Sequence, residues 1–127
     1  MTSSAASWTL AHRRVLVVED EYFIADDMAR ALQKLGAEVV GPVPTRDKAL
    51  ALVEAGRVDA AVLDINLRGQ TVFPVADALR ERGVPFVFAT GYDPSTVPAE
   101  YQDVPRWEKP FDPQVLAKML PSVVHAS

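Results

Sequence analysis

Two hydrophobic periods alternate along the chain. Short runs of almost continuous apolar residues, typical of buried strands, are separated by segments in which apolar residues recur every three or four positions, typical of amphipathic helices. The runs predict five strands, at residues 14–18, 37–43, 58–67, 84–90 and within 106–111. The periodic segments predict helices from Glu21 to Leu35, between Thr45 and Gly56, from about Phe73 to Arg82, and after Asp112.

Residues with special backbone roles mark several of these boundaries. Gly36, Gly56 and Gly83 each follow a periodic segment, and helices commonly end on such a left-handed residue. Thr45 and Asp112 are suited to cap the helices that they precede. We predict that the last helix buries an apolar face made of Val115, Leu116, Met119 and Leu120.

Apolar strands that alternate with helices indicate a parallel sheet covered on both faces. We therefore predict an α/β domain with a doubly wound sheet. If the strand order is 2-1-3-4-5, the ends of strands one and three are neighbours. Such sheets bind ligands at the carboxyl ends of their strands, so the polar residues at those ends are the candidate functional residues.

Polar side chains follow four of the five strands. Glu19 and Asp20 follow the first, Asp64 the third, Thr90 the fourth and Lys109 the fifth. Three carboxylates on adjacent strands repel one another unless a cation compensates them. Mg²⁺ prefers oxygen ligands and often shares its shell with a phosphate, whose other oxygens Thr90 and Lys109 are suited to bind. An aspartate in this position is a competent phosphoryl acceptor.

Simpler roles explain some neighbouring residues. The helix dipole favours Glu21 as a first-turn acid rather than as a metal ligand. Ile24 and Met28 already supply the apolar stripe of this helix, so Tyr22 and Phe23 have two interpretations. Both pack into the core, or one of them is exposed beside the site, where it would suit docking of a phosphodonor helix.

The strand ends taken together resemble the receiver domain of two-component response regulators. The resemblance extends from about Arg14 to Val124. It is carried by Glu19 and Asp20, by LDINL around Asp64, by FATG at the end of strand four and by KPF at 109–111. It implies a flavodoxin-like fold with a five-stranded parallel sheet in the order 2-1-3-4-5, and a receiver domain over residues 14–127.

The resemblance also implies residue roles. Asp64 is the phosphorylated residue, and the Mg²⁺ ligands are Glu19, Asp20, Asp64 and the backbone carbonyl of Asn66. Thr90 and Lys109 contact the phosphoryl oxygens, and the Lys109–Pro110 bond is expected to be cis. The donor is a phosphohistidine on a sensor histidine kinase or a histidine phosphotransfer protein, and the output passes through contacts with an unknown downstream protein.

One part of the pattern departs from the usual receiver. Many receivers carry a switch aromatic three positions before the lysine, where this chain has Arg106, and Trp107 is expected on the opposite face of the strand. Tyr92 gives the chain the FATGY sequence of a subset of single-domain receivers. Three prolines within 91–105 predict that helix four is short or irregular and that this segment responds to phosphorylation. The switch or gating candidates are Tyr92, Arg106, Trp107 and Pro110.

Composition narrows the function classes further. The 127 residues, 49% of them hydrophobic, predict one globular domain preceded by a mobile tail over residues 1–13. A net charge of −4 without a basic stripe argues against nucleic acid, and no apolar run approaches the roughly 20 residues of a membrane span. His12 and His125 lie near the two ends and there is no cysteine, which argues against a zinc site. We expect a cytoplasmic protein, a monomer or weak dimer.

Three functions remain open. The leading hypothesis is a single-domain response regulator without an output domain, a phosphoacceptor switch rather than an enzyme, with at most intrinsic self-phosphorylation and autodephosphorylation. The second is a phosphohydrolase with an aspartate nucleophile, although such enzymes commonly carry a second acid where this chain has Asn66. The third is a degenerate receiver that acts as a phosphorylation-independent adaptor, against which the intact Asp64, Thr90 and Lys109 argue.

Overall fold

The computed structural model describes residues 10–67, 69–90 and 97–108 together with residues 112, 115 and 120, and for Asn66, Thr90, Trp107 and Glu108 it describes the backbone alone. Five parallel strands form its main sheet: β1 (Arg14–Val18), β2 (Glu38–Val43), β3 (Ala60–Asp64), β6 (Phe86–Thr90) and β7 (Arg106–Glu108). Their order in the sheet is β2-β1-β3-β6-β7. The predicted doubly wound fold class is confirmed.

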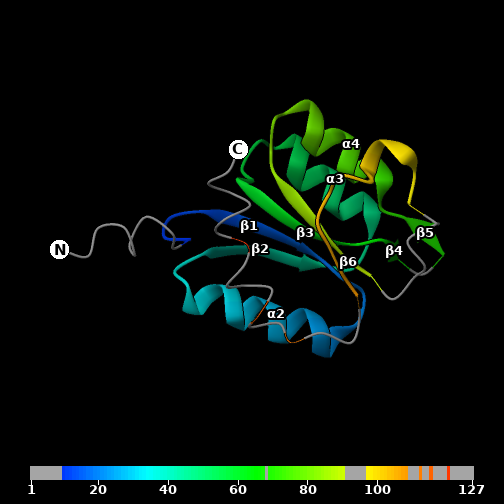
Figure 1. Cartoon of the computed structure of the whole chain (residues 1–127). Helices are drawn as coiled ribbons and strands as arrows, with labels where there is room; N and C mark the ends of the chain where they lie inside the picture. Colours follow the sequence, from blue (N-terminus) through cyan, green and yellow to red (C-terminus); the bar gives the residue numbers. More distant parts are fainter. Residues whose placement is uncertain are drawn as a thin grey trace.

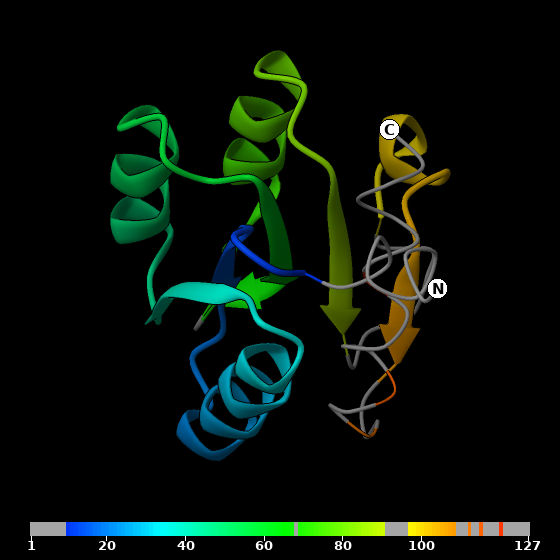
Figure 2. The same ribbon diagram turned by 90° about the vertical axis from the view of Figure 1, so that its left-hand side faces the viewer.

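Helices cover both faces of this sheet (Figures 1 and 2). α2 (Tyr22–Lys34) lies on one face, and α3 (Arg46–Glu54) and α4 (Phe73–Glu81) lie on the other. Successive side chains of a strand point to opposite faces, so β1 contributes Leu16 and Val18 to the core under α3 and α4 and Val15 and Val17 to the core under α2. Among the described residues, none of the helices has the length and apolarity that a membrane span requires.

The start of α3 follows the predicted capping. The side chain of Thr45 accepts a hydrogen bond from the backbone N–H of Lys48 at 3.3 Å. Gly36 and Gly56, which follow α2 and α3, have φ values of 91° and 77°, a backbone region that glycine adopts without steric cost.

Replacing the cap should measurably destabilise the domain. We expect Thr45→Ala to lower the free energy of unfolding by about 1 kcal/mol, because the N–H of Lys48 loses its acceptor. Thr45 is exposed, so the change removes little packing. Urea unfolding of Thr45→Ala and of Thr45→Ser, which keeps the hydroxyl, measures the difference. Equal stability of the two variants would contradict the assignment.

The predicted strand at 58–67 is too long. β3 leaves the sheet after Asp64, and β4 (Asn66–Leu67) pairs in antiparallel fashion with β5 (Gln70–Thr71). Leu67 of this hairpin is only 2% exposed. The apolar residues continue past the end of β3 because the hairpin also packs on the core. The largely apolar composition of residues 58–67 therefore did not reveal where the chain leaves the sheet.

Two predictions near the chain ends were wrong in part. Leu10, which we placed in the mobile tail, is fully buried, and its N–H donates to the carbonyl of Leu35 at 3.1 Å. Val115 is 48% exposed, whereas Leu120 is buried as predicted. The rest of the predicted last helix, and residues 1–9 of the tail, lie outside the described residues.

The fourth predicted helix, within residues 91–105 and distinct from α4, is irregular in its described part, as predicted. Its described part, residues 97–105, contains one short 3₁₀ turn, η2 (Ala99–Tyr101), before β7 begins. Residues 91–96 lie outside the described part of the chain.

Candidate functional site

The strand register brings the first and third strand ends together. Val18 pairs with Leu63 between β1 and β3, so the residues that follow them, Glu19 and Asp64, lie at the same edge of the sheet. The N–H of Glu19 donates to the carbonyl of Val43 at 3.1 Å, which holds this turn against the end of β2.

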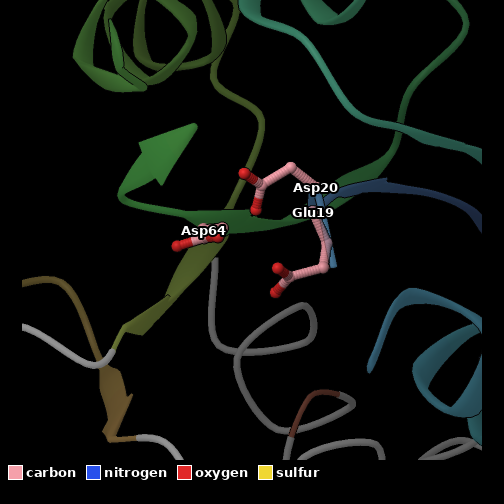
Figure 3. A group of neighbouring side chains, drawn as sticks. All are labelled: Glu19, Asp20 and Asp64. Atoms are coloured by element: carbon pink, nitrogen blue, oxygen red, sulfur yellow. The ribbon is translucent and has the colours of Figure 1, made fainter. Parts of the chain in front are cut away.

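Three carboxylates gather at this edge. One oxygen from each of Glu19, Asp20 and Asp64 lies within 4.8 Å of the others (Figure 3). Glu19 and Asp64 are only 3% and 4% exposed, and Asp20 is half-buried. The Oε2 atom of Glu19 accepts a hydrogen bond from the N–H of Glu21 at 3.2 Å. Glu21 itself is the N-cap residue of α2, one position before the first turn to which we had assigned it.

The donor set fits Mg²⁺. Carboxylate oxygens are the ligands that this ion prefers, and it usually keeps several waters besides one or two carboxylates. Two of the three acids are more than nine-tenths buried, and buried like charges are costly without a compensating cation. Adjacent and opposite oxygens of an octahedral shell lie about 3 and 4 Å apart, so the cluster needs little movement to hold one ion.

The described backbone of β6 and β7 ends at the same edge. Asp64 pairs with Ala89 of β6, so Thr90 follows directly at the neighbouring strand end. Thr90 in turn pairs with Glu108, the residue before Lys109. The side chains of Thr90 and Asn66, and all of Tyr92, Lys109 and Pro110, lie outside the described residues, so their roles and the cis bond stay predictions.

A hollow of about 340 Å³ lies beside the acids, and its lining includes Glu19, Asp20, Tyr22 and Pro42. Pro42 could not be found from the sequence, because only the pairing of β2 with β1 brings it here. Tyr22 and Phe23 are 74% and 80% exposed, and their rings meet edge to face with centroids 5.5 Å apart. The two aromatics therefore lie outside the core, at the end of α2 nearest the cluster.

Arg106, which stands where many receivers carry the switch aromatic, makes a polar contact. Arg106, half-buried, donates from a guanidinium nitrogen to the side-chain carbonyl of Gln102 at 3.3 Å. The backbone of Trp107 pairs with Ala89, and its side chain lies outside the described part. The switch roles of Arg106 and Trp107 stay predictions.

Comparison with known families identifies the class of protein. The family model of the response regulator receiver domain matches residues 15–121, which is most of the chain. The chain therefore belongs to the response regulator receiver domain family, as its strand ends indicated.

Several relatives share this domain. The chain is 32% identical over 111 residues to the sensory transduction protein LytT of Bacillus cereus, covering 84% of this chain and 45% of LytT. It spans about half the length of the curated relatives that it matches first. Among solved structures, the response regulator PhyR from Brucella abortus is similar at 28% identity and a TM-score of 0.79, covering 98% of this chain and 53% of that one.

A second solved relative is nearly coextensive with this chain. SdrG from Sphingomonas melonis Fr1 is 44% identical, with a TM-score of 0.77, covering 89% of this chain and 97% of that one. The BeF3-activated conformation of SdrG from Pseudomonas melonis Fr1 is similar at the same identity and a TM-score of 0.72, covering 90% and 98% of the two chains.

Proposed function

We propose that this chain is a phosphoacceptor switch of a two-component system or phosphorelay, in which Asp64 accepts a phosphoryl group from a phosphohistidine. The observation that carries the proposal is the buried cluster of Glu19, Asp20 and Asp64 at the carboxyl ends of two adjacent strands. Receiver domains are in general phosphoacceptor switches rather than enzymes, and membership of this family supports the proposal.

The proposed reaction is a transfer between two protein side chains. A carboxylate oxygen of Asp64 attacks the phosphorus, and the bond from phosphorus to the histidine nitrogen breaks, leaving its electron pair on the imidazole. Mg²⁺, held by Glu19, Asp20, Asp64 and the carbonyl of Asn66, would neutralise charge on the phosphoryl oxygens. Thr90 and Lys109 would bind the other phosphoryl oxygens.

The surroundings of the cluster support a protein donor. A donor histidine has to reach Asp64, so the donor surface covers whatever lies around the cluster. Tyr22 and Phe23 present two exposed rings there, and aromatic residues of this kind are frequent anchors of protein interfaces. A sensor histidine kinase or a histidine phosphotransfer protein is the proposed donor.

The similarity to SdrG supports a response to phosphorylation. Beryllofluoride mimics a phosphoryl group on an aspartate, and a BeF3-activated conformation is described for that relative. We propose that this chain likewise changes conformation and passes the signal to an unknown downstream protein. The receiver domain over 14–127, the cytoplasmic location and the monomeric or weakly dimeric state stay predictions.

Phosphorylation by a small donor tests the proposal. We expect acetyl phosphate to retard the chain on a phosphate-affinity gel only when Mg²⁺ is present. The modification should be acid-stable and base-labile, as expected of an acyl phosphate. A chain that shows no retardation and binds no beryllofluoride in the presence of Mg²⁺ would contradict the proposal and favour a phosphorylation-independent adaptor.

A further inference from the structure

The irregular segment before β7 inserts an aromatic ring into the core. Tyr101 is 1% exposed and packs among three phenylalanines, with which it forms an aromatic cluster. Its ring stacks on Phe73 of α4 at a centroid distance of 5.6 Å and an angle of 11°. It meets Phe86 and Phe88 of β6 edge to face, at 6.2 and 6.0 Å.

Arg80 of α4 holds this segment from outside. Its guanidinium carbon lies 4.7 Å from the ring centroid of Tyr101, and one nitrogen donates to the carbonyl of Glu100 at 2.6 Å. A second nitrogen lies 3.4 Å from a carboxylate oxygen of Asp103. That carboxylate is 78% exposed, so the ion pair contributes little. The ring contact and the hydrogen bond to the carbonyl are the stronger restraints, and η2 lies beside α4 accordingly (Figure 1).

The aromatic cluster is connected to the proposed phosphoryl site through β6. Phe88 precedes Thr90 by two positions in this strand, and its N–H donates to the carbonyl of Pro105 at 2.9 Å. The intervening residue, Ala89, pairs with Asp64. Close-packed interiors transmit strain, and Phe88, whose ring contacts that of Tyr101, is the residue that connects the carboxyl end of β6 with the aromatic cluster.

We propose that Arg80 is a positioning residue that latches residues 97–104 onto α4, and that phosphorylation of Asp64 opens this latch. The opening of the latch on phosphorylation rests on the proposed function, whereas the positioning role of Arg80 does not. The latch lies outside the acid cluster, so its strength can be changed without touching a proposed ligand.

Weakening the latch has two measurable consequences. The N–H groups of Tyr101 and Val104 bond to carbonyls within the segment, so their hydrogen exchange reports its opening. We expect Arg80→Gln to speed their exchange about tenfold, the effect of losing one charge-assisted hydrogen bond. By linkage, a ligand that opens the latch binds more tightly once the latch is weak. Beryllofluoride with Mg²⁺ should therefore bind several-fold more tightly to Arg80→Gln.

Matched variants separate the loss of the Arg80 contacts from a general loss of structure. Arg82→Gln removes an arginine at the end of the same helix, whose guanidinium contacts the carbonyl of Ala78 within α4, and should change neither readout. Arg80→Lys keeps the charge without the guanidinium fork and should be intermediate. The native chain should show faster exchange over 97–104 when beryllofluoride is bound, and Arg80→Gln should show little further increase.

Each contrary outcome identifies what is wrong. Unchanged exchange over 97–104 in Arg80→Gln would overturn the latch. Beryllofluoride binding that leaves this exchange unchanged in the native chain, or that weakens in Arg80→Gln, would overturn its coupling to phosphorylation while the proposed function stands. A native chain that binds no beryllofluoride would overturn the coupling and the proposed function together.

Discussion

Asp64→Asn is expected to abolish labelling by acetyl phosphate in the presence of Mg²⁺ while leaving the fold intact. The amide has nearly the same shape as the carboxylate but supplies no anionic oxygen to attack phosphorus. Asp64 is 4% exposed and lies within 4.8 Å of two other acids, so the neutral side chain also relieves repulsion. Without Mg²⁺ we expect the free energy of unfolding to rise by roughly 1 kcal/mol.

Phosphate-affinity gels and intact mass measure the labelling, and urea unfolding measures the stability. Asp27→Asn is the matched control, because Asp27 is an exposed acid of α2 outside the cluster. This control should be labelled like the native chain. Labelling of Asp64→Asn at the native level would show that another residue is the acceptor, whatever the fold of the variant.

Mg²⁺ is expected to stabilise the native chain against heat and to have little effect on Asp20→Asn. An ion that binds only the folded state adds about 2.7 kcal/mol at a hundred times its Kd, which amounts to a rise of several degrees in Tm for a domain of this size. Asp20 supplies one of the three clustered oxygens and is half-buried, so its substitution removes a proposed ligand with little loss of packing.

Thermal unfolding with Mg²⁺, and with NaCl at equal ionic strength, separates specific binding from screening. Asp27→Asn again serves as the control and should keep the full rise in Tm. An equal rise in Asp20→Asn would show that Mg²⁺ acts away from the cluster. A rise that NaCl reproduces in every variant would indicate screening of surface charge.

The alternation of strands and helices followed from local pattern, whereas the order of the strands in the sheet was implied by the resemblance to receiver domains. Side chains of a buried parallel strand are apolar on both faces, and helices repeat their apolar residues every three to four positions. These periods placed β1, α2 and β6 close to their observed bounds. Parallel strands end at one edge of the sheet, so with the strand order 2-1-3-4-5 the acids Glu19, Asp20 and Asp64 were expected to meet, and the structure brings them together.

Contacts between distant segments were decided by the tertiary structure alone. Leu10 stands outside any hydrophobic period, yet it is buried because its side chain belongs to the apolar cluster that includes Met28 and Leu32 of α2. Arg80 and Glu100 are 20 residues apart, and neither lies in a motif that links them. Packing of this kind depends on which elements become neighbours in space, information that a local period does not contain.

The aromatic residues show the same division. The composition of α2 left open whether Tyr22 and Phe23 are core or surface, because an amphipathic helix accepts a large residue at either edge of its stripe. In the structure both side chains are exposed. Tyr101 is the converse: it lies in a proline-rich stretch with no helical period, and it is buried because α4 and β6 place three phenylalanine rings around it. A strand or helix period specifies which way a side chain points, and only the assembled layers determine what it meets there.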